Sequence, residues 1–246
     1  MGLVIILFFL YVSLFIISIR IKDNSIVDIF WGIGFVIISL YYFIQFDYSL
    51  YKLLILLLIG FWGCRLAYYI LQRKLKDPKE DYRYAVWRKE WNNFYLRSFF
   101  QVYILQMILM LIVSLPLYYV FLSESLNIYY YLIGIIVSIV GLTIEIIADS
   151  QVKNYILQYG KTNKVYTGGL YKYTRNPNYF GESMFWLGIS IIGMGESIIS
   201  VVGFITITFL LVFVSGVPLK EKRQSTKENR KEYKNSTSIF IPWKKF

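Results

Sequence analysis

The chain has 246 residues, of which 57% are hydrophobic and only 17% are charged, and its mean hydropathy is +0.52. A soluble domain carries about 25% charged residues, so the composition excludes an ordinary soluble domain and predicts an all-α, polytopic membrane protein. The formal net charge is +11. Basic residues beside apolar segments explain this charge better than nucleic-acid binding does, so no nucleic-acid partner is expected.

Seven apolar runs follow one another along the chain, and each is near the ~20 residues that cross a bilayer as a helix. They lie at about 3–19, 26–46, 53–72, 98–121, 128–148, 180–195 and 198–217. The runs predict seven transmembrane helices in a single membrane-embedded domain, residues 1–246. No small-residue cleavage site follows the first run, so we expect it to be retained as a span.

Lysine and arginine are distributed unevenly between the segments that separate these runs. Two lie in 20–22, eight in 73–97, five in 149–179 and nine in 218–246, which accounts for all but two of the 26. These four segments follow the odd-numbered runs and therefore share one side of the membrane. By the positive-inside rule that side is the cytoplasm, so the N-terminus is predicted outside and the C-terminus in the cytoplasm.

The chain contains no histidine and a single cysteine, Cys64. Histidine is the commonest general acid–base and the commonest metal ligand, and one cysteine cannot build a disulfide framework. We therefore expect no metal site. Any chemistry must use Tyr, Lys, Arg, Asp, Glu or Asn side chains, or a bound cofactor.

Polar groups gather in segment 149–179, between the fifth and sixth runs. Glu145, Asp149 and Lys153 are spaced four residues apart and share one face of a helix that continues past the fifth run. Carboxylates inside a membrane usually face a cavity or a partner. A salt bridge from Glu145 to Lys153 or Arg65 at the helix end is the alternative.

The stretch TRNPNYFGE, residues 174–182, reads as a turn followed by a helix start. Pro177 suits the first helical position because it has no N–H to leave unpaired. The N–H groups and the dipole of the new helix favour an anion, and Arg175 adds a fork for phosphate. Asn178 and Glu182 lie one turn apart on one face. Interface anchoring would explain the nearby tyrosines but not these polar groups.

Two further basic segments lie on the same predicted side. The loop 71–91 contains the run EDYRY and is either a plain solvated loop or a lid over the same anion. In the tail, 219–246, most bases are expected to contact water or anionic lipid. Tyr233 and the closing IFIPW stand out, because Pro242 and Trp243 could fold back on the membrane surface.

Together these residues carry a family resemblance. The series Asp149–Gln151–Lys153, GGLYKYTRNPNYFGE and EKR…EYKNSTSIFIPW resembles the DUF1295 branch of the steroid 5-alpha-reductase superfamily. VDIFWGIGF, GCRLAYYI, EDYRYAVWRKEW and SFFQVYILQ resemble the same branch, so the likeness covers nearly the whole chain. The wider superfamily also holds sterol reductases and isoprenylcysteine carboxyl methyltransferases. The Glu of the GE pair favours the reductases.

The resemblance implies a seven-helix membrane reductase that takes NADPH from the cytosolic side. Carried over by motif, it puts Asp149, Asn178 and Glu182 at cofactor-binding positions. Lys164 stands where the steroid reductases have an arginine, and lysine lacks the bidentate fork for a 2′-phosphate. The full set expected to bind the cofactor is Arg83, Asp149, Lys153, Lys164, Tyr171, Arg175, Asn176, Asn178, Tyr179, Glu182 and Tyr233.

The family's catalytic pair is a Glu and a Tyr that hydrogen-bond a substrate carbonyl and stabilise the charge on its oxygen as hydride arrives. This chain has no clean copy of the pair. We expect Asp28, at the start of the second run, to be the acid, although it could instead cap a helix. Tyr69 in the third run is the expected phenol, with Tyr68 close behind.

The expected reaction is hydride transfer from NADPH to the activated C=C of a lipophilic enone, steroid-like or isoprenoid. The expected partners are that substrate and membrane lipid, and the expected location is a bacterial cell membrane rather than the endoplasmic reticulum. A methyltransferase that uses S-adenosylmethionine and acts on a lipid or an isoprenylcysteine is the alternative. A non-enzymatic lipid-binding scaffold is the third hypothesis.

Overall fold

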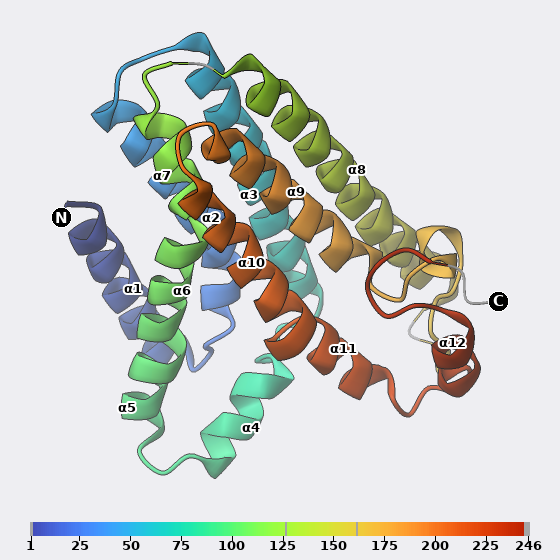
Figure 1. The fold of residues 1–246 in the computed structure, drawn as a ribbon. Coiled ribbons are helices and arrows are strands. Elements are labelled where there is room, and N and C mark those ends of the chain that lie inside the picture. Colours follow the sequence, from blue (N-terminus) through green and yellow to red (C-terminus); the bar gives the residue numbers. More distant parts are fainter. Residues whose placement is uncertain (1, 126, 161, 244–246) are drawn as a thin grey trace. The chain divides into compact units, whose positions relative to one another are not determined.

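The computed structural model describes residues 2–125, 127–160 and 162–243 (Figure 1). The chain is 79% helical and its described part contains no β-strand, which confirms the all-α class. It divides into two compact units, Met1–Glu124 and Ser125–Phe246, called unit 1 and unit 2 below.

The helices of unit 1 follow the first four apolar runs. They are α1 (Gly2–Ile21), α2 (Ile26–Gln45), α3 (Leu50–Lys76), α4 (Tyr82–Glu90), α5 (Phe94–Ser98), the π-helix η1 (Phe99–Ile104), α6 (Leu105–Val113) and α7 (Leu115–Leu122). The fourth run, expected as one helix over 98–121, is interrupted at Ser114, which ends α6. Pro116 lies in the first turn of α7, where its missing N–H costs no hydrogen bond.

Close packing of α2 against α3 holds unit 1 together. A Cβ at Gly32 would lie 2.3 Å from the Gly63 carbonyl oxygen, and one at Gly63 would lie 2.5 Å from the Gly32 carbonyl oxygen. The two backbones therefore touch, and the buried rings of Phe35 and Trp62 pack edge to face beside them. Small residues allow such close helix approach in membranes, where packing replaces the hydrophobic effect as the driving force.

Unit 2 is built on one long helix and a second that lies against it. Its elements are α8 (Ile128–Tyr159), the 3-10 turn η2 (Gly169–Lys172), α9 (Pro177–Met194), the 3-10 turn η3 (Ile198–Ser200), α10 (Val201–Phe209), the π-helix η4 (Leu210–Val214), α11 (Val217–Gln224) and α12 (Arg230–Ser236). The expected continuation of the fifth helix is confirmed, because α8 runs through Glu145, Asp149 and Lys153 on to Tyr159.

Glycines also bring α8 and α9 into backbone contact. A Cβ at Gly141 would lie 2.4 Å from the backbone nitrogen of Phe185 and 2.6 Å from the Gly181 carbonyl oxygen. The same closeness recurs near Gly188, where a Cβ would lie 2.4 Å from the Gly134 carbonyl oxygen. The pair α8–α9 thus forms a rigid support for the segment that joins the two helices.

Replacing Gly141 with Val is expected to destabilise the protein by about 1–3 kcal/mol, because the added atoms meet backbone that cannot repack. The midpoint of thermal unfolding in detergent measures the effect. Gly60→Val is the matched control, since a Cβ at Gly60 meets no atom within 4 Å. Equal midpoints for the two variants would show that α8 and α9 do not pack this closely.

Among the described residues, six helical stretches are long and apolar enough to cross a membrane, and they identify an integral, multi-pass membrane protein. They are Gly2–Ile21, Ile26–Gln45, Leu50–Lys76, Phe94–Val113, Ile128–Tyr159 and Ile198–Gln224. Helix α9 forms where the remaining run was expected, but its polar first turns keep it out of this set. Large apolar side chains such as Ile44, 70% exposed, and Phe213, 68% exposed, lie on the surface of the protein, as a chain embedded in lipid requires.

Candidate functional site

The polar segment of unit 2 is fixed by the end of the chain. Residues 237–243, which we call the C-terminal strap, lie along the segment before α9. The backbone N–H of Arg175 donates to the Ser238 carbonyl at 2.9 Å, and the Asn176 side-chain amide donates to the Ile239 carbonyl at 2.7 Å. Asn176 is therefore held by the strap, and it immediately precedes Pro177, the first residue of α9.

Two further hydrogen bonds complete this attachment. The Thr174 hydroxyl donates to the Phe240 carbonyl at 2.8 Å, and the Trp243 N–H donates to the Tyr173 carbonyl at 3.0 Å. The tail thus folds back, as IFIPW suggested, but the polar partner it finds is segment 173–176. Thr174 is buried as a result, and the turn that precedes α9 is held by hydrogen bonds to the strap.

Two buried arginines share one carboxylate at this helix mouth. Arg175 Nη1 lies 2.8 Å from Glu221 Oε2, and the Arg230 guanidinium contacts Glu221 Oε1. Burial lowers the pKa of Arg175; Glu221 opposes this shift, whereas Arg230 adds to it. The pair is therefore a concentrated positive charge that a single carboxylate only partly balances.

Lys220 brings the expected cofactor residues of α9 and η2 together. Its ammonium donates to the Arg175 carbonyl at 3.1 Å and to Asn178 Oδ1 at 3.4 Å. It also lies 4.9 Å from the ring centre of Tyr171 and 5.5 Å from that of Tyr179. The Lys220 amine thus contacts four of the residues that the sequence analysis predicted to bind the cofactor. Sequence reasoning missed Lys220 itself, because the tail was expected to be mostly solvated.

Tyr233 and Tyr171 pack together beneath the cluster around Lys220. Both are buried, and the Tyr233 hydroxyl donates to the Tyr171 carbonyl at 2.7 Å. They pack with Ala148 and Val165 in one apolar cluster, and burial raises the pKa of Tyr233. Tyr233 therefore acts through its position, joining α12 to η2.

A cavity of about 380 Å³, partly open to solvent, lies beside Tyr233. Its lining combines hydroxyl groups with one base and one acid, a chemistry that suits a hydroxylated or phosphorylated ligand part. The lining residues are Thr167, Lys172, Asn229, Glu232, Tyr233, Ser236 and Thr237.

The carboxylates of α8 and α9 are buried, while the two expected lysines are not. Glu145 is 2% exposed, and Asp149 and Glu182 are each 8% exposed. The Asp149 carboxylate acts electrostatically on the Lys220 ammonium, so α8 contributes to the same cluster. Lys153 and Lys164 are exposed, and no hydrogen bond or ion pair within the described residues joins their ammonium groups to it.

A second polar group lies in unit 1, around Asp28 in the first turn of α2. Arg83 Nη2 donates to Asp28 Oδ2 at 2.6 Å, and the Tyr84 hydroxyl donates to Asp28 Oδ1 at 2.9 Å. Arg83 also donates to Asp81, which caps α4. Asp28 is thus engaged by side chains of α4. Arg83, expected to bind the cofactor, is paired within unit 1.

The phenol that hydrogen-bonds Asp28 belongs to Tyr84, not to Tyr69, the residue favoured from sequence. Tyr84 is 1% exposed, and both burial and the Asp28 carboxylate raise its pKa. Tyr69 lies on α3, with the Arg73 guanidinium 6.0 Å from its ring centre. Tyr84 belongs to the quoted run EDYRY, but nothing in the spacing of residues 28 and 84 shows that they meet.

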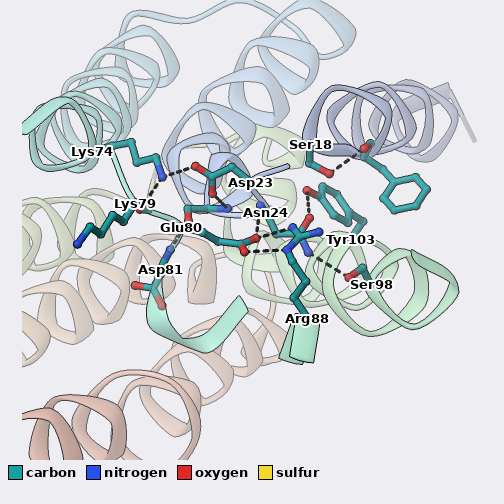
Figure 2. Close-up of polar contacts among 12 residues, drawn as sticks. Ser18, Asp23, Asn24, Lys74, Lys79, Glu80, Asp81, Arg88, Ser98 and Tyr103 are labelled. Atoms are coloured by element: carbon teal, nitrogen blue, oxygen red, sulfur yellow. Dashed lines mark hydrogen bonds and ion pairs between the residues drawn. The ribbon is translucent and has the colours of Figure 1, made fainter. Parts of the chain in front are cut away.

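The loop before α4 is fastened to the turn between α1 and α2, as Figure 2 shows. Glu80 accepts two hydrogen bonds from Arg88, at 2.9 and 2.7 Å, and one from the Asn24 backbone N–H at 2.9 Å. Lys74 forms an ion pair with Asp23 in the same turn. This part of the expected lid is therefore anchored, and it holds α4 where Tyr84 reaches Asp28.

Replacing Glu80 with Gln is expected to cost about 2–3 kcal/mol of stability, because the variant loses charge-assisted hydrogen bonds to Arg88 in a mostly buried setting. The matched control is Glu90→Gln, an exposed position at the end of α4 with the same change of charge. Thermal unfolding in detergent compares the two. If Glu80→Gln unfolds no earlier than Glu90→Gln, this network does not hold the loop.

The comparisons with known proteins concern the whole chain. A family model described as "Protein of unknown function (DUF1295)" matches residues 14–237. No curated protein and no solved structure matches the chain. The match spans both polar groups described above, so both belong to the region that the family model covers.

Proposed function

The chain belongs to the DUF1295 family, and we propose that it is a membrane oxidoreductase. It transfers a hydride from NADPH to the activated C=C of a lipophilic, steroid-like or isoprenoid enone. The observation that carries the proposal is a cationic cluster, in which the buried Arg175 and Arg230 contact Glu221 and the neighbouring Lys220 donates to the side chain of Asn178. Clustered bases of this kind fit the phosphates of a dinucleotide.

Unpaired buried polar atoms support a ligand at this cluster. Arg175 Nε and Asn176 Oδ1 are buried and have no hydrogen-bond partner among the described residues. Such atoms cost free energy unless something satisfies them. Asp149 and Glu182 offer carboxylates to ribose hydroxyls, and the ring of Tyr179 offers a face for stacking. The residues present therefore fit NADPH, which supplies a hydride when bound.

The Asp28–Tyr84 pair is proposed to activate the substrate carbonyl. The pKa of Tyr84 is raised, which keeps its hydroxyl protonated. This hydroxyl can therefore donate a hydrogen bond to the carbonyl oxygen of the substrate. Arg83 keeps Asp28 paired when Tyr84 turns its proton from the carboxylate to the substrate. A buried donor of this kind stabilises the negative charge that develops on a carbonyl oxygen during reduction.

We also propose the membrane topology expected from the sequence. Helix α9 is the additional span beside the six apolar ones, because it is 18 residues long and apolar in its second half. Seven spans place the four base-rich segments on one side of the membrane. The positive-inside rule then puts the N-terminus outside and the C-terminus in the cytoplasm.

An experiment that does not require a known substrate tests this function. Membranes that contain the chain are incubated with NADPH deuterated at C4 of the nicotinamide and with a lipid extract, and lipids are analysed by mass spectrometry. We expect deuterium to enter one class of isoprenoid or steroid-like lipid. Equal labelling by membranes with the native chain and with Tyr84→Phe would contradict the proposal.

A further inference from the structure

One carboxylate bridges two arginines that lie far apart in the sequence. Arg175 precedes α9 and Arg230 begins α12, and each contacts a different oxygen of Glu221 on α11. The side chains of Arg175 and Arg230 are 4% and 7% exposed, whereas that of Glu221 is 20% exposed. The two arginines are therefore the interior part of this arrangement. Glu221 is the more exposed side chain, although its Oε1 atom is itself buried.

The charges in this arrangement do not balance. Two guanidinium groups face one carboxylate, and the Lys220 ammonium lies 3.1 Å from the Arg175 carbonyl. The Asp149 carboxylate acts electrostatically on Lys220. Because buried charge is costly unless it is fully paired, the site retains an attraction for further negative charge.

Hydrogen-bonding capacity is also left over. Arg175 donates through Nη1 to Glu221, but its buried Nε has no hydrogen-bond partner in the part of the chain that the structure describes. Arg230 donates to Gln224 Oε1 at 3.0 Å in addition to its contact with Glu221. A guanidinium presents donors in a fork that matches two oxygens of one anion. Glu221 offers each arginine only one oxygen, so the forks are incompletely used.

We propose that Glu221 holds the place of a phosphate group, and that the Arg175–Arg230 pair is the subsite for a phosphate of the bound dinucleotide. This inference rests on the proposed function. A phosphate brings more oxygens and more negative charge than a carboxylate, and so satisfies both forks. Glu221, at the solvent edge, is the group that gives way. It therefore competes with the ligand and sets the affinity of the site.

The consequence is that removing the charge of Glu221 strengthens phosphate binding. In Glu221→Gln the side chain keeps its shape, but it no longer competes for the two guanidinium groups. We expect the affinity for inorganic pyrophosphate to rise by about tenfold, the equivalent of one charge-assisted hydrogen bond. A purely structural salt bridge predicts the opposite, because its loss would only weaken the site.

Pyrophosphate titration of the purified full chain in detergent, followed by thermal stabilisation, tests this inference. Glu228→Gln is the matched control, since it removes one negative charge from an exposed position two residues before α12 and outside the cluster. The expected order of affinity is Glu221→Gln first, with Glu228→Gln and the native chain equal. Unchanged or weaker binding by Glu221→Gln would overturn the proposal.

A second variant covers the case in which Glu221→Gln does not fold. Glu221→Asp keeps the negative charge, but the side chain is one methylene shorter and its carboxylate lies further from the arginines. It therefore competes less, and pyrophosphate affinity should still rise by several-fold. No rise would overturn the inference. A rise in pyrophosphate affinity without any NADPH binding by the native chain would support the phosphate subsite and reject the reductase, so the two proposals fail separately.

Discussion

Tyr84→Phe is expected to lower turnover by about 100-fold to 1,000-fold, the usual cost of removing one hydrogen-bond donor to a developing oxyanion. The affinity for NADPH should stay unchanged, because Tyr84 belongs to the Asp28 group of unit 1 and not to the cationic cluster of unit 2. The rate of deuterium transfer to lipid measures turnover, and NADPH-dependent thermal stabilisation measures binding.

The control for this variant is Tyr69→Phe, which removes the other candidate hydroxyl from unit 1. We expect it to retain most of the native turnover, since the hydroxyl that donates to Asp28 is that of Tyr84. The reverse pattern is a large loss of turnover in Tyr69→Phe with near-normal turnover in Tyr84→Phe. It would show that Tyr69 on α3, and not Tyr84, supplies the hydroxyl. It would also separate Asp28 from its proposed partner.

Lys220→Met is expected to weaken NADPH binding by about 10-fold to 100-fold, the range for one hydrogen bond to a charged group. Methionine nearly matches the length of lysine, so packing between Tyr171 and Tyr179 should be kept while the positive charge is lost. Thermal stabilisation at a series of NADPH concentrations gives the affinity. The fall should appear in binding before it appears in turnover at saturating NADPH.

Lys222→Met provides the matched control on the same helix. Lys222 is exposed on α11, two residues after Lys220, and carries the same charge. If the two variants lose affinity equally, general attraction of the basic tail accounts for the effect, and the cluster around Asn178 is not the binding site.

Most of the fold could be predicted because an apolar run of about 20 residues crosses a bilayer as a helix, so the runs mark the helices. The breaks within runs were harder, since the end of α6 at Ser114 depends on Pro116 two residues later. Helix α9 shows the limit of the length rule. The polar residues Asn178 and Glu182, which marked it as part of a site, also make its first turns unlike a lipid-facing span.

The site could be predicted where neighbouring residues share one helix or one turn. Tyr171, Arg175, Asn178 and Tyr179 come together as the motif suggested. Their partners on α11 and α12 could not be found in this way, because they lie more than forty residues further along the chain. The same holds for Tyr84, whose contact with Asp28 depends on how the loop before α4 is anchored.

The central claim is that the cationic cluster binds NADPH, and ligand-dependent thermal stabilisation of the purified chain tests it most directly. The chain in detergent is heated with millimolar NADPH, NADH or S-adenosylhomocysteine. We predict that NADPH raises the unfolding temperature and that S-adenosylhomocysteine does not. No shift with NADPH, or a shift with S-adenosylhomocysteine alone, would contradict the reductase and favour a scaffold or a methyltransferase respectively.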